Sequence, residues 1–273
     1  VIAGKLAGVK VIWHLNDTYA PKAIRILFYF ISRFSDAFIY ASLRSKEYYE
    51  SLTNKEIPSY IIPAPVDIEK FNPCLNYSKE EASIKSWEGS TVIGMIANIS
   101  PVKSIETFIK ALDIINKECV NIIFVVIGTH YKSQKKYLTM LKKMVTNLSV
   151  DNIEFIGSVS DVRPLLKRFD IYVCSSDFES SPISVWEAMS MEKPIVSTNV
   201  GDVSQYIEDK KNGFIVNTKD YYMLAKRVVQ LINNKQLCDN FGKKARLTAI
   251  NNLDISISSK KHFDAYTSTI KQI

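Results

Sequence analysis

The stretch Asp170-Ile-Tyr-Val-Cys-Ser-Ser-Asp-Phe-Glu-Ser-Ser-Pro-Ile-Ser-Val-Trp-Glu-Ala-Met-Ser-Met-Glu-Lys-Pro-Ile-Val-Ser-Thr-Asn-Val-Gly201 decides the fold. Ile171 to Cys174 is an apolar, β-rich run, which predicts a buried strand. Residues 175–182 are dense in turn formers, so this strand ends in an irregular loop. Ser184 to Met191 predicts a short helix, and Ile195 to Ser197 begins a second buried strand.

The start of this predicted helix is a candidate anion site. Ser181 or Ser184 is the expected N-cap, and Glu187 follows Ser184 in capping-box spacing. A helix that opens directly after a strand aims unpaired N–H groups and the positive end of its dipole at a ligand, which suits a phosphate. Glu187 would then accept hydrogen bonds from a ribose, and Glu179 would face the other end of the ligand. Spacing alone leaves open that Glu187 only caps its helix and that Glu179 is a solvated loop residue.

A longer pattern around these residues resembles a known enzyme family. Glu179-x7-Glu187 is followed by Ala188-Met189, Lys193-Pro194-Ile195-Val196 and Val200-Gly201. This pattern is similar to the donor-binding signature of the retaining nucleotide-sugar glycosyltransferases of the GT-B fold, family four (glycosyl transferases group 1). The resemblance implies that Glu187 holds the nucleotide ribose and that Glu179 lies near the transferred sugar. It also implies that the loop backbone contacts the diphosphate at Ser181, Pro182, Ile183 and Ser184.

The loop after the apolar run Thr91 to Ala97 is the second place where the resemblance applies. This loop in the family carries an Arg and a Lys that both hold the diphosphate. Lys103 matches the Lys, whereas Asn98 stands where the Arg is expected, so one of two phosphate-binding cations is absent. A lysine at a helix start is unfavourable unless an anion is near, which favours an anionic partner for Lys103. The resemblance further places the nucleobase against Ser158 and Val159.

Composition sets the class of the protein. The chain has 273 residues, of which 47% are hydrophobic, enough for one large domain or two ordinary ones. Its four cysteines are widely spaced without a CxxC pair, so we expect neither a zinc site nor disulfides, but reduced cytosolic thiols. No apolar run reaches the roughly 18 residues that a membrane-spanning helix needs. We therefore expect a cytoplasmic protein.

The positive net charge leaves several partners open. A net charge of +7 suits nucleic acid, an anionic membrane surface or a phosphorylated substrate. No RNA-binding signature, helix-turn-helix or zinc finger supports nucleic acid, so we expect no nucleic-acid partner. Pro21 to Phe34 is helical in period, apolar and basic. It either packs inside the fold or lies on the inner face of a membrane that contains anionic lipids.

The beginning of the chain supplies one more candidate residue. Val9 to Trp13 predicts a strand, and His14 follows it in a polar loop, at the end of a strand where open α/β sheets bind ligands. His14 is therefore a candidate for contact with the acceptor or the transferred sugar. Many members of the family carry a His after this strand. Because the chain opens at Val1, in what resembles the end of a helix, we expect a fragment whose beginning is missing.

Strands and helices alternate throughout, which predicts parallel sheets covered on both faces. We expect an α/β protein of the GT-B fold with two Rossmann-like domains. Residues 1–88 would be a partial acceptor-side domain and linker, and residues 89–273 a donor-binding domain. Its last helix, from Ile255 to Ile273, would cross back to the first domain.

The expected function is transfer of a hexose-like sugar from a UDP-sugar or GDP-sugar to a hydroxyl of a saccharide or lipid-linked acceptor. The resemblance implies retention of configuration, no metal, no resident cofactor, and a role in surface polysaccharide or glycolipid synthesis. Lys103, Glu179 and His14 are the candidate catalytic residues. A noncatalytic nucleotide-sugar binding module and a nucleotide-sugar epimerase remain alternatives. A dehydrogenase is disfavoured because no GxGxxG follows a predicted strand.

Overall fold

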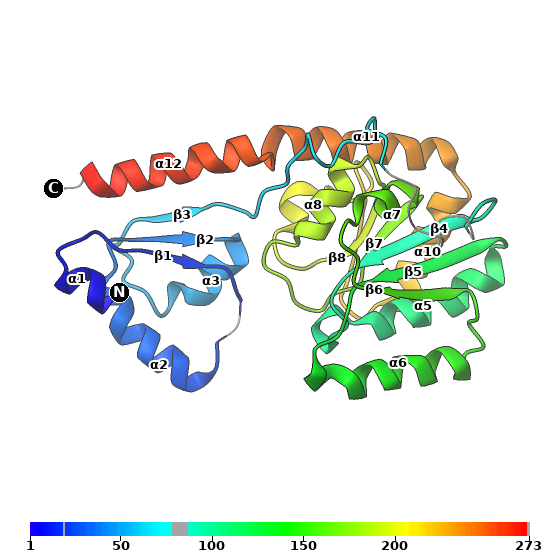
Figure 1. Cartoon of the computed structure of the whole chain (residues 1–273), viewed down its shortest axis with the longest axis horizontal. Helices are drawn as coiled ribbons and strands as arrows, with labels where there is room; N and C mark the ends of the chain where they lie inside the picture. Colours follow the sequence, from blue (N-terminus) through cyan, green and yellow to red (C-terminus); the bar gives the residue numbers. More distant parts are fainter. Residues whose placement is uncertain (19, 78–86, 272–273) are drawn as a thin grey trace.

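The computed structural model describes residues 1–18, 20–77 and 87–271. Within these ranges the strands form two parallel sheets, ordered β1-β2-β3 and β6-β5-β4-β7-β8-β9. Figure 1 shows the sheets in two lobes that lie side by side. We call residues 1–66 the N-terminal lobe and residues 87–254 the C-terminal lobe. The prediction of an α/β fold with parallel sheets is confirmed.

The N-terminal lobe carries the smaller sheet. Its elements are α1 (Ile2–Leu6), β1 (Ile12–Leu15), α2 (Lys22–Ile31), the 3-10 helix η1 (Ser32–Phe34), β2 (Ala37–Tyr40), α3 (Leu43–Glu50) and β3 (Ser59–Ile61). All four residues of β2 are buried, as expected for the central strand of a parallel sheet. Helix α3 begins with a capping box between Ser42 and Ser45.

The C-terminal lobe repeats the strand-helix alternation around the larger sheet. Its elements are β4 (Thr91–Ile96), η2 (Pro101–Lys103), α5 (Ile105–Glu118), β5 (Ile122–Ile127), η3 (Lys132–Gln134), α6 (Lys135–Asn147), β6 (Ile153–Gly157), α7 (Arg163–Arg168), β7 (Ile171–Cys174), α8 (Ile183–Ser190), β8 (Ile195–Thr198), α9 (Val203–Tyr206), β9 (Phe214–Val216), α10 (Tyr221–Ile232) and α11 (Lys235–Asn252). The central strand β7 has the bounds that its apolar run predicts, and its four residues are buried.

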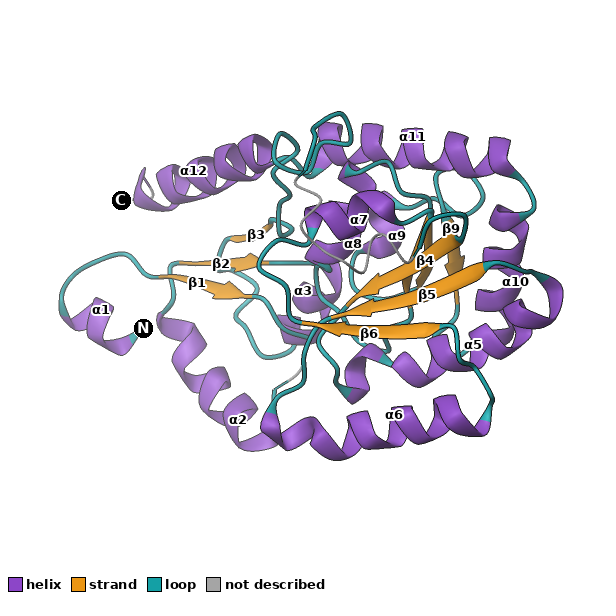
Figure 2. Ribbon diagram, turned by 45° about the vertical axis from the view of Figure 1, so that its right-hand side comes forward, coloured by secondary structure: helices purple, strands orange, loops and turns teal. Residues whose placement is uncertain are grey.

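Two apolar clusters cover the two faces of the larger sheet. One contains the buried side chains of α5 and α10, such as Leu112 and Val228, against β4 and β5. The other contains Trp87 and the buried residues of α7 and α8, such as Trp186. Figure 2 shows helices on both sides of this sheet. The carboxyl ends of its strands are left uncovered by these helices, so loops at that edge form the site.

A last helix, α12 (Ile255–Lys271), runs from the C-terminal lobe along the N-terminal lobe (Figure 1). Ala265 of α12 is buried in a small cluster with Ile39 and Ile62. The chain crosses between the lobes twice at one place, because Val66 pairs with Asp254 in an isolated bridge. The amide of Val66 donates to the carbonyl of Leu253 at 2.8 Å.

Direct polar contacts also join the lobes. The buried carboxylate of Asp202, 2% exposed, accepts from the amide of Leu43 in the first turn of α3 at 2.9 Å. The hydroxyls of Ser42 and Ser180 lie 3.0 Å apart. The amide of Ala64 donates to Ser181 Oγ at 2.9 Å. The loop of the motif is therefore fixed partly by the N-terminal lobe.

Two details of the sequence prediction need comment. His14 is part of strand β1 rather than of the loop that follows, because β1 pairs with β2 as far as Leu15 and Tyr40. The expected boundary at residue 88 adjoins residues 78–86, which lie outside the described residues, whereas Trp87 is fully buried in the C-terminal lobe. Across the described ranges, no helix combines the length and apolar character that crossing a bilayer requires.

Candidate active site

The loop between β7 and α8 is clamped to the loop after β4. Ser175 Oγ donates to the carbonyls of Lys103 at 3.1 Å and Ser104 at 2.9 Å. The amide of Asp177 donates to the carbonyl of Val102 at 2.8 Å. These bonds bring together two segments that are far apart in the sequence, which places Lys103 beside the motif.

Gly201, at the end of the motif, supports the same loop. Its φ is +52°, and a Cβ at this position would lie 2.2 Å from the carbonyl oxygen of Ser180. The amide of Asp202 donates to that oxygen at 3.0 Å. Only glycine combines this backbone conformation with such a close approach.

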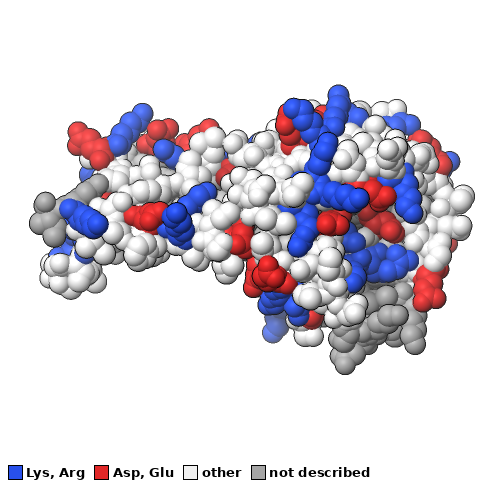
Figure 3. All heavy atoms as spheres, turned by 90° about the horizontal axis from the view of Figure 1, so that it is seen from above, with Lys and Arg blue, Asp and Glu red and all other residues white. Residues whose placement is uncertain are grey.

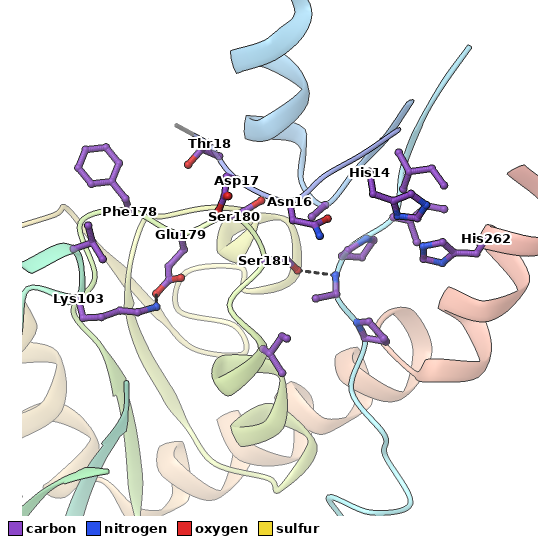
Figure 4. A pocket seen from close by; sticks show the side chains of 18 residues that line it. His14, Asn16, Asp17, Thr18, Lys103, Phe178, Glu179, Ser180, Ser181 and His262 are labelled. Atoms are coloured by element: carbon purple, nitrogen blue, oxygen red, sulfur yellow. Dashed lines mark hydrogen bonds and ion pairs between the residues drawn. The ribbon is translucent and has the colours of Figure 1, made fainter. Parts of the chain in front are cut away.

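Lys103 and Glu179 form an ion pair, with Lys103 Nζ 2.6 Å from Glu179 Oε1. Ser176 Oγ donates to the same carboxylate oxygen at 2.7 Å. The Lys103 side chain is 24% exposed and that of Glu179 is 13% exposed. The anion beside Lys103 in this structure is therefore the carboxylate of Glu179, which orients both side chains toward one point (Figure 4).

Helix α8 begins differently from the prediction. Its N-cap is Pro182, and no side chain caps its first turn. Ser184 therefore lies inside the first turn, and the expected capping box with Glu187 does not form. Ser181 Oγ is occupied elsewhere, because it accepts from Trp186 Nε1 at 3.0 Å and from the amide of Ala64. The uncapped start of α8 is what an anion site at this helix requires.

Two cavities meet at the ion pair. The first, which we call the donor-side cavity, has a volume of about 450 Å³. It lies beside the carboxyl ends of β4, β5 and β6 and beside the loop that precedes α8. Its lining includes most of the predicted nucleotide-binding residues, namely Asn98, Lys103, Ser158, Val159, Ser181, Pro182, Ile183 and Ser184. Among the described residues of this lining, Lys103 is the one cation. Asn98, which is neutral, lines this cavity at the position where the family resemblance predicts a second positive charge.

The inter-lobe cavity, of about 720 Å³, lies between β1 and the motif loop. Lys103, Glu179, Ser181 and Ile183 line both cavities, so the two are adjacent. His14 lines the inter-lobe cavity, together with Asn16 and Asp17 of the loop after β1 (Figure 4). All three candidate catalytic residues therefore face one cavity.

The surroundings of His14 include two residues of α12. His14 Nε2 shares a hydrogen bond of 3.1 Å with the hydroxyl of Tyr266. The rings of His14 and His262 stack with centroids 5.5 Å apart and planes 10° apart. Partial burial, and then the charge of His262, lower the pKa of His14 from its usual value. His14 is therefore predominantly neutral near pH 7.

Glu187 differs from the expectation. It is partly buried and lines neither cavity. Burial raises its pKa to about 7, and Lys70 opposes this shift. In this structure Glu187 is therefore separate from the other predicted nucleotide-binding residues, which line the donor-side cavity.

Sequence reasoning missed His262, Tyr266 and Asp202. His262 and Tyr266 of α12 belong to no recognisable motif. The helical pattern of this segment predicts only that one of its faces is exposed. Asp202 follows the motif directly, but its partner Leu43 is distant in sequence and carries no signal. In the described part of the chain, no three His, Cys, Asp or Glu side chains gather closely enough to hold a metal ion.

Residues 77–248 match the profile of the family described as glycosyl transferases group 1. The chain belongs to this family. It is 26% identical over 182 residues to a poly(ribitol-phosphate) alpha-N-acetylglucosaminyltransferase of Staphylococcus aureus, covering 66% of this chain and 36% of that protein. It is 24% identical over 280 residues to a UDP-Gal:alpha-D-GlcNAc-diphosphoundecaprenol alpha-1,3-galactosyltransferase of Escherichia coli, covering 97% of this chain and 71% of that protein. The chain spans 36%, 52% and 48% of the length of three curated relatives.

Solved structures show the same fold. The crystal structure of HepE from Anabaena in complex with UDP and glucose superposes with a TM-score of 0.86 at 20% identity, covering 98% of this chain and 74% of that chain. A sucrose-phosphate synthase from Thermosynechococcus elongatus superposes with a TM-score of 0.82 at 14% identity, covering 98% and 71%. The predicted GT-B arrangement of Rossmann-like lobes in this group 1 glycosyltransferase family member is thus confirmed.

Proposed function

We propose that this group 1 family member transfers a hexose-type sugar from a UDP-sugar or GDP-sugar to a hydroxyl group, with retention of configuration. The acceptor is a saccharide or a lipid-linked saccharide of surface polysaccharide or glycolipid synthesis, on the cytoplasmic side of the membrane. The observation that carries this proposal is the ion pair of Lys103 and Glu179 at the junction of two cavities. Donor and acceptor can then meet at one point.

The relatives agree with this substrate class. The crystallised HepE holds UDP and glucose. The Escherichia coli relative is named for transfer from UDP-Gal to a diphosphoundecaprenol-linked sugar, and the Staphylococcus relative for action on poly(ribitol-phosphate). HepE and the Escherichia coli relative are thus associated with UDP or a UDP-sugar. The names of the Escherichia coli and Staphylococcus relatives both include a phosphate-bearing acceptor.

The donor-side cavity supplies the groups for a nucleoside diphosphate. The uncapped amides at the start of α8 and the ammonium of Lys103 would bind the diphosphate and stabilise its charge as it leaves. Ser158 and Val159 would contact the base. Glu187 would hold the ribose after a change of its side-chain rotamer. No bound metal is part of this proposal.

The inter-lobe cavity supplies the groups for the transferred sugar and the acceptor. Glu179 would position the sugar, and its carboxylate would release Lys103 to the diphosphate as the donor enters. His14, which is predominantly neutral near pH 7, would contact the acceptor or the transferred sugar. The proposal thus assigns different ends of the site to different substrates.

A thermal-shift screen of the chain against nucleoside diphosphates and their sugars tests the donor assignment, because a ligand that binds the folded state stabilises it more as its concentration rises relative to its dissociation constant. We expect UDP or GDP to raise the melting temperature, and Lys103→Met to make this rise smaller. An assay with labelled donor and candidate acceptors then separates the functions. Product that forms only with an acceptor supports transfer, whereas product from the donor alone indicates an epimerase.

One observation favours a second candidate, a module that binds nucleotide sugars without transferring them. Lys103 is the one cation among the described residues that line the donor-side cavity, since Asn98 is neutral. Asn98→Arg would restore a bidentate phosphate contact. If the chain transfers sugar, this variant should retain or raise activity. If it is a binding module, the variant should bind UDP more tightly and still transfer nothing.

We also propose that α2 docks on an anionic membrane. Ile26 is 62% exposed and Phe30 is 61% exposed, and Ile24 and Leu27 are also exposed beside Lys22. Apolar and basic side chains on one surface helix suit the boundary of an anionic bilayer. The face that carries α11 and α12 shows Lys and Arg interspersed with Asp and Glu (Figure 3), and α12 also exposes apolar side chains such as Phe263 and Ile270.

Liposome flotation tests this docking. We expect the chain to float with vesicles that contain anionic lipid and not with neutral vesicles, and Phe30→Ala to weaken flotation. Phe263→Ala is the matched control, because Phe263 is 68% exposed but lies on α12. Equal loss in both variants, or no flotation of the unaltered chain, would reject docking through α2.

A further inference from the structure

His14 and His262 form a stacked pair at the end of the inter-lobe cavity that lies away from Lys103 and Glu179 (Figure 4). Both rings line the cavity, and Figure 4 shows them side by side, away from Lys103 and Glu179. Their planes are 10° apart. Because α12 supplies His262, the last helix of the chain contributes directly to a cavity built mainly from loops.

Hydrogen bonds fix which ring nitrogens are free. His262 Nδ1 lies 2.8 Å from the carbonyl oxygen of Ser258, which can only accept, so Nδ1 carries a hydrogen. His14 Nε2 bonds to the hydroxyl of Tyr266. Within the described residues, neither His14 Nδ1 nor His262 Nε2 has a hydrogen-bond partner. Two imidazole nitrogens are thus available to a ligand.

The charges around the pair select the kind of ligand. Burial and His262 are the two influences that shift the pKa of His14, and both lower it. The other charged groups of the cavity are Asp17, Lys103 and Glu179, and Lys103 and Glu179 pair with each other. A bound anion would supply the missing counter-charge.

A metal ion fits less well. A catalytic zinc site uses three protein ligands, and no group of three suitable side chains occurs among the described residues. Parallel rings also direct their nitrogens along parallel planes rather than toward one centre. Two oxygens of one phosphate can instead each take one ring nitrogen.

We propose that His14 and His262 bind a phosphate group that the acceptor carries next to its accepting sugar. This proposal rests on the proposed transferase function and adds the class of acceptor. Neutral His262 presents Nε2 as an acceptor, whereas protonated His262 presents it as a donor, so phosphate binding takes up a proton.

The three histidines of the chain make the test simple. We would record imidazole NMR signals of the chain saturated with UDP, which blocks the diphosphate site, while adding methyl phosphate. The signals of His14 and His262 should shift, and the titration midpoint of His14 should rise. The signal of His130 should stay fixed, because His130 lines neither cavity.

Two variants sharpen the result. His262→Gln should weaken methyl phosphate binding about tenfold, the effect of losing one charge-assisted hydrogen bond. His130→Gln should leave it unchanged, as the matched removal of an imidazole elsewhere. UDP binding should be the same in both variants, so a failure of the donor assignment shows separately as absent UDP binding.

Several outcomes would overturn the proposal. One is that methyl phosphate shifts no histidine signal, and another is that all three shift equally, which indicates nonspecific binding. A third is that Zn²⁺ shifts the signals of His14 and His262 while methyl phosphate does not. The pair would then bind a metal ion rather than an anion.

Discussion

Replacement of Glu179 by Gln should separate donor binding from sugar transfer. The carboxylate holds Lys103 at 2.6 Å and accepts from Ser176. The amide oxygen of Gln keeps the bond from Ser176 but releases Lys103 to the diphosphate. An exposed ion pair contributes about 0.2–1 kcal/mol, and a hydrogen bond to a charged group about 1.5–3 kcal/mol.

The Lys103–Glu179 pair lies between these cases, since its side chains are 24% and 13% exposed. We therefore assign the interaction between Lys103 and Glu179 about 1.4 kcal/mol, which corresponds to a factor of ten in affinity. Glu179→Gln should bind UDP up to about tenfold more tightly, whereas Lys103→Met should bind it about tenfold more weakly. Sugar transfer should fall about a hundredfold or more in both, as for loss of a preorganised charge at a reaction centre.

Isothermal titration with UDP and a transfer assay with saturating donor measure the two effects. Circular dichroism of each variant checks that the fold persists. Weaker UDP binding by Glu179→Gln, of the same size as for Lys103→Met, would refute competition between the carboxylate and the diphosphate. Unchanged turnover in Lys103→Ala and Glu179→Ala would remove both residues from the reaction.

Three further predictions concern the frame of the site. Gly201→Ala should destabilise the chain more than Gly89→Ala in thermal unfolding, because both have positive φ but only Gly201 faces a backbone oxygen within 3 Å, and Gly89 has open space around it. Burial raises the pKa of Glu187 to about 7 from an unfolded value of about 4.3, so the stability of its protonated form is complete below about pH 4.3 and lost as the pH rises through 7. Glu187→Gln should therefore raise the free energy of unfolding at pH 8, by on the order of 4 kcal/mol at most, and raise it less at pH 5. Equal effects of the substitution at the two pH values in denaturant titrations would contradict this. Asp202→Ala removes the carboxylate that accepts from the amide of Leu43, so small-angle X-ray scattering should show a larger radius of gyration, and an unchanged radius would show that this contact does not hold the lobes together.

Local patterns predicted the larger sheet well. The run Ile171 to Cys174 became β7 with those bounds, because a buried parallel strand needs uninterrupted apolar residues. The last helix was also predicted, from Ile255 onward. Most predicted nucleotide-binding residues line one cavity, since the carboxyl ends of parallel strands share one edge of a sheet.

Predictions that depended on a single side chain were less successful. Ser184 matched a capping box in spacing, but the helix begins one residue earlier, at Ile183, with Pro182 as an N-cap whose side chain makes no hydrogen bond. His14 was expected in a loop, but pairing with β2 extends the strand through it. The pairs Lys103–Glu179 and Leu43–Asp202 could not be predicted, because only the folded backbone brings such distant positions together.

The paired crossings at Val66 and Asp254 constrain how the protein can move. Both covalent connections between the lobes pass through one hydrogen-bonded point, so any rotation of one lobe must pivot there. Displacement grows with distance from a pivot, so contacts close to it, such as that of Ala64 with Ser181, move least. The rim of the inter-lobe cavity far from this pivot would then open most, while the loop around Ser181 keeps its shape.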